Sequence, residues 1–172
     1  MHNRTSQIIL GLILSSTLGQ LLAADNQSAP VANPPNPRYV IKGGEVYDKK
    51  SDLTWQRCSV GQRWVNEAKG CRGLVKTFTF DDARALANGT WRVPTVGELK
   101  TLIDYDRTGP DKKPTIDDVA FPNMDRYQDW YWTSEPGGAS GGWVVLFHNS
   151  LINDAIYYRG NTGAVRLVRR GQ

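Results

Sequence analysis

Short runs of apolar and β-prone residues, separated by polar turns, predict most of the strands in this chain. Residues 39–41 form the first expected strand. Residues 45–47 and 53–56 flank a polar turn at 48–52, and this arrangement predicts a β-hairpin. Farther along the chain, similar runs predict four more strands, at residues 130–134, 143–147, 151–158 and 164–169.

Two segments between these groups of strands have the spacing and the end signals of helices. Residues 80–88 follow Thr79, a capping residue, and carry apolar side chains at i, i+3 and i+4. Residues 96–103 follow Thr95, whose hydroxyl can cap the N–H of Glu98 while the Glu98 carboxylate reaches back. The order of strands, two helices, a long polar stretch and more strands predicts an α+β fold.

The N-terminal part of the chain predicts export rather than folded structure. Residues 1–24 combine Arg4 with a mostly apolar stretch at 8–22, a pattern typical of a secretory signal peptide. That stretch is short for a membrane span, and an uncleaved N-terminal anchor is the alternative. Residues 25–37 are rich in proline and predict an extended linker, so we expect one folded domain over residues 38–172.

Net charge limits the classes of partner. The 172 residues carry a net charge of +4, and removal of the expected signal with Arg4 leaves 20 basic and 17 acidic residues, or +3. This balance permits attraction to acidic surfaces. An exported chain without a basic stripe is not expected to bind nucleic acid, and no membrane span is expected in the mature chain because no later apolar run is long enough.

The two cysteines, Cys58 and Cys71, both lie in the part of the chain that is expected to be exported, where disulfides form. A bond between them would close a 14-residue loop, and the loop-entropy model gives it roughly 3 kcal/mol. Residues 57–76 are expected to form a loop that this bond holds together. Free thiols or half of a zinc site are the alternatives. The other zinc ligands are missing, because His2 lies in the signal and His148 stands alone.

Eight motifs occur along the chain in one order. They are Val46-Tyr47-Asp48 with Leu53-Thr54-Trp55-Gln56, Cys58 with Cys71-Arg72-Gly73, Phe80-Asp81-Asp82-Ala83, Trp91-Arg92-Val93-Pro94-Thr95 with Glu98-Leu99, Ile116-Asp117 with Phe121-Pro122-Asn123, Tyr131-Trp132-Thr133-Ser134, Trp143-Val144-Val145 with Phe147, and Val165-Arg166-Leu167-Val168-Arg169. Together they make the chain resemble the Lcl C-terminal domain family of bacterial exported proteins, over about residues 44–170.

The resemblance implies a C-type-lectin-like fold, with two short helices on antiparallel sheets, long loops and one disulfide. The resemblance also implies a binding role, because proteins with this fold bind more often than they catalyse. The fold is nevertheless related to that of formylglycine-generating oxidases. The family is named from a collagen-like adhesin that binds sulfated glycosaminoglycans. This chain lacks the collagen-like Gly-x-y region of that adhesin.

Candidate binding residues are basic or aromatic and lie late in the chain. Arginine can hold sulfate or carboxylate groups through paired hydrogen bonds, and aromatic rings can stack on sugars. The candidates are Arg159, Arg169, Arg170, Trp130, Tyr157 and Tyr158. Arg166 shares a face of its expected strand with apolar residues, which indicates a buried structural role instead.

A calcium site is a weaker alternative. Glu135-Pro136 followed by Asn153-Asp154 is spaced roughly as in calcium-dependent lectins, and Glu135, Asn153 and Asp154 could supply oxygen ligands. Gly137 replaces the asparagine of the lectin motif, and plain turns are the simpler interpretation. We therefore expect no cofactor and no metal.

The sequence thus predicts a non-catalytic exported binding domain, periplasmic or extracellular, that recognises acidic or sulfated glycans. A protein-binding or structural component of the cell envelope is the alternative. An enzyme related to formylglycine-generating oxidases is a third hypothesis, and it is disfavoured because the two cysteines lie early in the chain.

Overall fold

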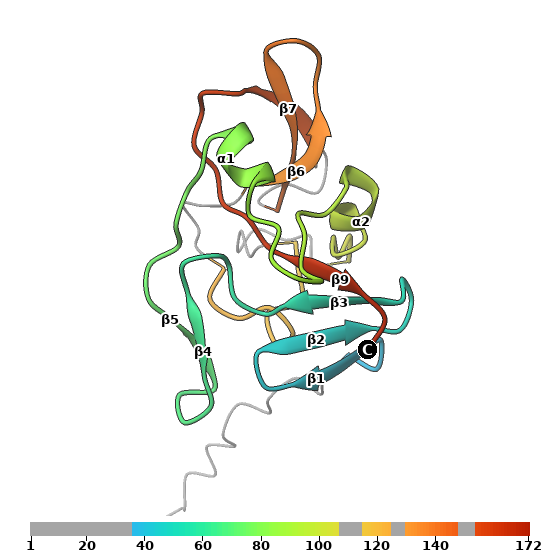
Figure 1. Ribbon diagram of the computed structural model, residues 1–172. Helices are drawn as coiled ribbons and strands as arrows, with labels where there is room; N and C mark the ends of the chain where they lie inside the picture. The colour runs from blue at the N-terminus through green and yellow to red at the C-terminus, as the bar shows by residue number, and fades with distance from the viewer. Residues whose placement is uncertain (1–35, 107–114, 125–129, 148–153) are drawn as a thin grey trace, which may run out of the picture. The chain divides into compact units, whose positions relative to one another are not determined.

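A computed structural model describes residues 36–106, 115–124, 130–147 and 154–172, which all lie in one compact unit, residues 33–172 (Figure 1). The expected signal peptide at 1–24 and residues 25–35 of the expected linker lie outside the described residues. Within the described ranges, no helix has the length and apolarity needed to cross a bilayer.

An antiparallel sheet of four strands begins and ends the folded unit. Its spatial order is β1-β2-β3-β9, so the last strand of the chain pairs with the third. The strands are β1 (Tyr39–Lys42), β2 (Glu45–Asp48), β3 (Leu53–Gln56) and β9 (Val168–Arg170). Trp55 lies opposite Val46 on one side and Val168 on the other. The predicted first strand and the predicted hairpin are confirmed.

A second antiparallel sheet has three strands in the order β6-β7-β8. These are β6 (Trp130–Pro136), β7 (Gly141–Leu146) and β8 (Asp154–Tyr158). Helix α1 (Phe80–Arg84) packs closely on this sheet. A Cβ atom at Gly142 would lie 2.2 Å from the Cδ2 atom of Phe80, so only glycine allows the ring this close.

Both predicted helices form, and both are shorter than predicted. Helix α1 spans Phe80–Arg84 and α2 spans Val96–Lys100. Their caps agree with the prediction, since Thr79 accepts from Asp82 N–H and Thr95 forms a capping box with Glu98. After α2 the chain continues in tight turns, in which Leu102 donates to Leu99 and Ile103 donates to Lys100. The apolar spacing is therefore satisfied by a turn tighter than an α-helix.

Residues 57–76, expected as a loop, contain a small hairpin, and the expectation was wrong there. Strand β4 (Arg63–Val65) pairs antiparallel with β5 (Gly70–Arg72), and Trp64 lies opposite Cys71. The predicted disulfide between Cys58 and Cys71 is confirmed. With it, the α+β class, the antiparallel sheets and the two short helices are confirmed.

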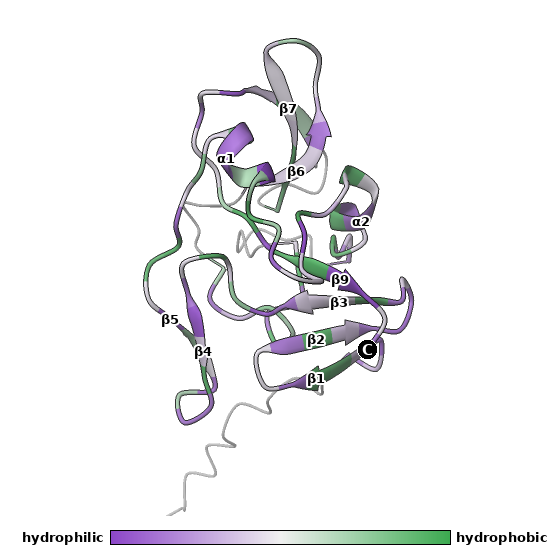
Figure 2. Cartoon of the chain, viewed as in Figure 1, coloured by the Kyte–Doolittle hydropathy of each residue, from purple (hydrophilic) through white to green (hydrophobic). Residues whose placement is uncertain are grey.

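Two hydrophobic clusters form the core, and residues 164–168 run between them. Ala164 and Val168 belong to the first cluster, whereas Val165 and Leu167 belong to the second. In Figure 2, the start of β9 and part of the chain just before it are green, the colour of hydrophobic residues. The segment predicted as a strand at 164–169 is therefore buried on both sides, and only its end forms β9. Alternation between core and solvent does not apply to such a segment.

The predicted structural role of Arg166 agrees with its position. The residue is 1% exposed and donates from Nη1 to the carbonyl of Gln56 at 2.8 Å. Its guanidinium lies 5.1 Å from the ring centre of Phe121 and 5.6 Å from that of Tyr131. Arg166 therefore ties the end of β3 to the aromatic core.

Candidate functional site

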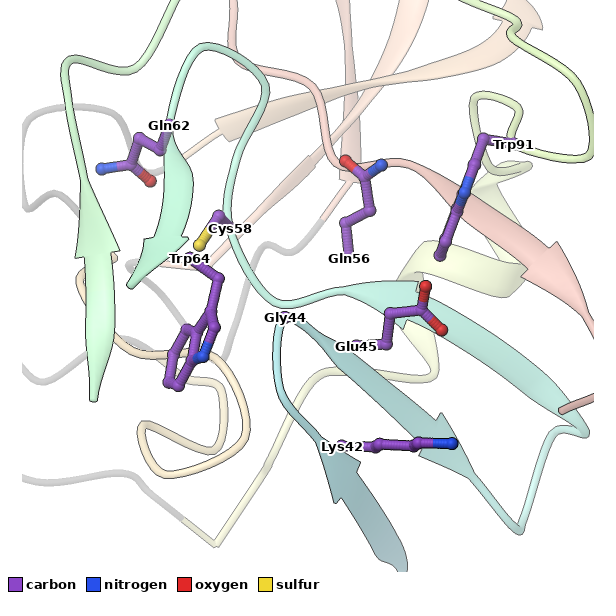
Figure 3. A pocket seen from close by; sticks show the side chains of 8 residues that line it. All are labelled: Lys42, Gly44, Glu45, Gln56, Cys58, Gln62, Trp64 and Trp91. Atoms are coloured by element: carbon purple, nitrogen blue, oxygen red, sulfur yellow. The ribbon is translucent and has the colours of Figure 1, made fainter. Parts of the chain in front are cut away.

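A groove of about 550 Å³ opens between the four-stranded sheet and the β4–β5 hairpin (Figure 3). One tryptophan stands at each end of it in this view, with polar side chains between them. The lining residues are Lys42, Gly44, Glu45, Gln56, Cys58, Gln62, Trp64 and Trp91. They come from β1, β2, β3, β4 and three connecting segments, so the groove is built from both the four-stranded sheet and the β4–β5 hairpin.

The first wall is Trp64, which the hairpin strand β4 carries. Its indole Nε1 donates to Oδ1 of Asn66 at 2.6 Å. The guanidinium carbon of Arg57 lies 3.8 Å from the ring centre, within the range of a cation–π contact. Arg57 is itself buried and does not line the groove. Trp64 was not among the predicted binding residues, because its segment had been interpreted as a loop.

The second wall is Trp91, just before the capping segment of α2. The ring is half-buried and packs partly on the second hydrophobic cluster. The guanidinium carbon of Arg169 lies 5.3 Å from its ring centre. Nη2 of Arg169 also donates to Oε2 of Glu45 at 2.9 Å. Each tryptophan of the groove is therefore accompanied by an arginine that another group holds in place.

Between the two tryptophans, the polar side chains offer both donors and acceptors. Glu45 is about half exposed, and only its Oε2 has a hydrogen bond among the described residues. Gln56 brings an amide with a donor and an acceptor. Lys42 brings an exposed ammonium that has no ion pair within the described part of the chain. Flat aromatic walls with mixed polar groups between them suit a ligand with hydroxyl groups and apolar ring faces.

The three predicted arginines occupy different surroundings. Arg159 forms an ion pair with Asp81 and lies 5.0 Å from the ring centre of Phe80. Arg169 is held by Glu45 beside the groove. Arg170 is exposed and has no ion pair among the described residues. The structure therefore brings Arg169 to the groove and leaves Arg170 as the most available of the three.

Arg170 lines a second cleft, of about 490 Å³, together with Arg84 and Arg92. Arg92 is engaged there, because its Nη1 and Nη2 donate to the two carboxylate oxygens of Glu98 at 2.7 and 2.6 Å. That contact lowers the pKa of Glu98 below its usual value, against the opposing effect of burial. Among the described residues, Arg84 and Arg170 are the arginines of this cleft without an ion pair.

The predicted aromatic residues lie on the three-stranded sheet, and none of them lines the groove. Trp130 packs edge-on against Trp132 at 5.2 Å and against Tyr157 at 4.8 Å between ring centres. These contacts belong to the second hydrophobic cluster. Tyr158 is 66% exposed at the end of β8, whereas Trp130 and Tyr157 are half-buried.

Two of the candidate calcium ligands, Glu135 and Asp154, already have hydrogen-bond partners in the protein. Oε2 of Glu135 accepts from the backbone N–H of Val96 at 2.6 Å. Oδ1 of Asp154 accepts from Nζ of Lys100 at 3.0 Å. Both contacts fasten α2 to the three-stranded sheet. Asn153 lies outside the described residues, and within the described ranges no three His, Cys, Asp or Glu side chains are grouped as a metal site.

A comparison with known protein families supports the resemblance described above. The model of the Lcl C-terminal domain matches residues 44–169. The chain belongs to the Lcl C-terminal domain family. The groove lies almost entirely within the matched region of this Lcl C-terminal domain, since all its lining residues except Lys42 fall inside it. No curated protein matches the chain.

Proposed function

We propose that this Lcl C-terminal domain is an exported, non-catalytic binding domain that recognises a glycan in the groove between Trp64 and Trp91. One observation carries the proposal: two aromatic walls enclose amide, carboxylate and ammonium groups in one open groove. Indole rings present apolar faces to sugar C–H groups, and the polar groups can exchange hydrogen bonds with hydroxyls. The disulfide is consistent with an exported, periplasmic or extracellular protein.

The state of the cysteines supports a binding role over an oxidase. The chain has two cysteines, and both are joined in the disulfide that holds the β4–β5 hairpin. An oxidase that works through a reactive cysteine needs a thiolate at its site. Cys58 does line the groove, but as part of this bond.

The distribution of charge supports acidic groups on the glycan. Lys42 lines the groove, and Arg169 offsets the negative charge of Glu45 beside it. Arg170 adds an available guanidinium in the second cleft, which Arg84 also lines. A sulfate or carboxylate on the ligand would find paired donors on such arginines.

A protein partner is the second candidate, and one observation favours it. Ile156 and Tyr158 are 51% and 66% exposed on β8, a strand at the edge of its sheet. Exposed apolar and aromatic side chains on an edge strand suit contact with another protein surface. This surface contributes no residue to the groove, so the two candidates can be tested separately.

A glycan array followed by calorimetry of the best-binding oligosaccharide tests the proposal. The array includes heparin, hyaluronan and chitin fragments, which are sulfated, carboxylated and uncharged. We expect Trp64→Ala to weaken binding at least tenfold, and Tyr158→Ala to leave it unchanged because that ring lies outside the groove. Binding that survives Trp64→Ala but fails in Tyr158→Ala would move the site to β8. No binding to any array glycan would reject glycan recognition.

Heparin chromatography tests the acidic part of the proposal. We expect Arg170→Ala to elute at lower salt than the unchanged protein, because Arg170 is exposed without an ion pair in the described region. Arg159→Ala should have a smaller effect, since its charge is already offset by Asp81. Elution of the unchanged protein below about 0.15 M salt, where electrostatic contacts are still strong, would remove the acidic preference.

A further inference from the structure

The β4–β5 hairpin, which carries Trp64, is not part of either hydrophobic cluster. The two hydrophobic clusters include residues from every helix and strand except β4 and β5, the two strands of the hairpin Arg63–Arg72. The hairpin forms a two-stranded sheet of its own. Two isolated strands are marginally stable in water, so specific contacts must determine where this wall stands.

A covalent bond supplies the first of these contacts. Cys71 on β5 is joined to Cys58, the second residue after β3 ends. Cys71 is also the register partner of Trp64 across the hairpin, and directly opposite residues in a sheet lie close together. The backbone N–H of Cys71 donates to Oδ1 of Asn123 at 2.9 Å. The disulfide therefore anchors the hairpin at the residue that faces the tryptophan.

Arg57 supplies the second contact, as a fixed surface beneath the indole ring. Its Nε donates to the carbonyl of Ala120 at 2.9 Å, Nη1 to Gly43 at 2.9 Å and Nη2 to Val119 at 2.7 Å. The residue is 6% exposed, and burial lowers the pKa of its guanidinium. Three carbonyl acceptors from two chain segments fix the orientation of the guanidinium. Its central carbon lies 3.8 Å from the ring centre of Trp64.

We propose that Arg57 is a positioning residue for the groove, and that Arg57 and the Cys58–Cys71 disulfide together set the orientation of Trp64 independently of the core. The inference rests on the proposed function, because a positioned wall matters only if a ligand uses it. A planar guanidinium can stack on an indole while donating in its own plane, whereas a lysine ammonium cannot do both. Removing either contact should therefore move Trp64 and leave the two hydrophobic clusters intact.

The experiment reads the tryptophans directly, by ¹⁹F NMR of the full chain labelled with 5-fluorotryptophan. The six tryptophans give six resonances, and Trp64→Phe assigns the one in question. We expect Arg57→Lys to shift and broaden the Trp64 resonance while those of Trp55 and Trp132, both fully buried, stay in place. Arg63→Lys is the matched control, because Arg63 is an exposed arginine on the same hairpin.

A second variant keeps the test decisive if Arg57→Lys does not fold. The double variant Cys58→Ala and Cys71→Ala removes the anchor and leaves Arg57 in place. We expect the same selective movement of the Trp64 resonance in this variant. A Trp64 resonance that is unchanged in the folded variants would overturn the proposal, and so would one that moves only together with Trp55 and Trp132.

Binding measurements separate this proposal from the proposed function. With the best-binding array oligosaccharide as the probe, we expect at least fivefold weaker binding in each folded variant. If Arg57→Lys and the double cysteine variant bind the oligosaccharide as tightly as the unchanged protein, while Trp64→Ala still binds it more weakly, the positioning role is overturned and glycan recognition stands. If the unchanged protein binds no array glycan but the Trp64 resonance moves selectively, the glycan function fails and the positioning of Trp64 stands.

Discussion

Glu98 offers a test of how one carboxylate couples local structure to pH. Its Oε2 accepts from the backbone N–H of Thr95 at 2.9 Å, which closes the capping box of α2. Both of its oxygens accept from Arg92, at 2.7 and 2.6 Å. The substitution Glu98→Gln keeps the size of the side chain and an oxygen for the cap, because glutamine also serves at this position. It removes only the charge.

The expected loss of stability is small and can be bounded. The side chains are 36% exposed for Arg92 and 21% for Glu98, so solvent screens part of the attraction. A partly exposed ion pair with paired hydrogen bonds is worth about 0.5–1 kcal/mol. Glu98→Ala would also remove the cap, and the total should then reach about 1–2 kcal/mol. We therefore expect about 0.5–1 kcal/mol for Glu98→Gln at pH 7.

The pH dependence supplies the sharper criterion. The hydrogen bonds from Arg92, and then the backbone N–H of Thr95, lower the pKa of Glu98 from its ordinary value of 4.5, although burial opposes them. A carboxylate with a lowered pKa in the folded state stabilises the fold above its unfolded value. That contribution is lost as the pH falls through the folded value. The difference between the unchanged protein and Glu98→Gln should thus be largest near neutral pH and shrink below pH 4.5.

Urea unfolding followed by tryptophan fluorescence, from neutral to acid pH, measures this difference. Glu67→Gln is the matched control, because Glu67 is exposed on the β4–β5 hairpin and should change the curves little. A Glu98→Gln difference that stays constant across the pH range would refute the reasoning. The reasoning would also be refuted if Glu98→Gln cost the same free energy of unfolding in the Arg92→Met background. In that background the Glu98 charge has already lost its arginine partner.

Three further substitutions test contacts elsewhere in the fold. Gly142→Ala should lower the free energy of unfolding by about 1–3 kcal/mol, because its Cβ would lie 2.2 Å from Phe80; thermal unfolding that matches the unchanged protein would contradict this. Asp48→Asn should cost about 1–3 kcal/mol in denaturant unfolding, since its inaccessible carboxylate accepts from Arg38, Lys50 N–H and Ser51. Asp81→Asn should cost less than about 0.5 kcal/mol, because that side chain is 66% exposed, and a loss as large as that of Asp48→Asn would argue against burial as the deciding factor.

The parts of the fold that could be predicted are those whose signals are local. The hairpin of β2 and β3 follows from alternation around a polar turn, and Asp52 takes the left-handed conformation there, with φ of 55°. Thr79 and Thr95 were identified as caps because the chemistry of a helix start involves residues only three apart. The disulfide was identified because no other cysteine competes.

The parts that could not be predicted depend on residues distant in the sequence. Strands β4 and β5 have three residues each, too few for alternation to show, so their segment was interpreted as a loop. Trp64 becomes a groove wall only because Arg57 and Cys71 hold it. A tryptophan in a polar segment between two cysteines was the one available signal. Arg159 and Arg169 were candidates for ligand binding, and their ion pairs with Asp81 and Glu45 could not be foreseen because those carboxylates lie early in the chain.

The pairing of β9 with β3 has a consequence for the time at which the fold can close. Trp55 and Val168 are register partners, although more than a hundred residues separate them in the chain. The β1–β2–β3 meander needs only neighbouring residues and can assemble while the chain is still emerging. Its open edge at β3 then waits for the last strand, and such long-range pairing is slow to form. The four-stranded sheet is therefore complete only once residues 168–170 have reached β3, so its closure comes late in folding.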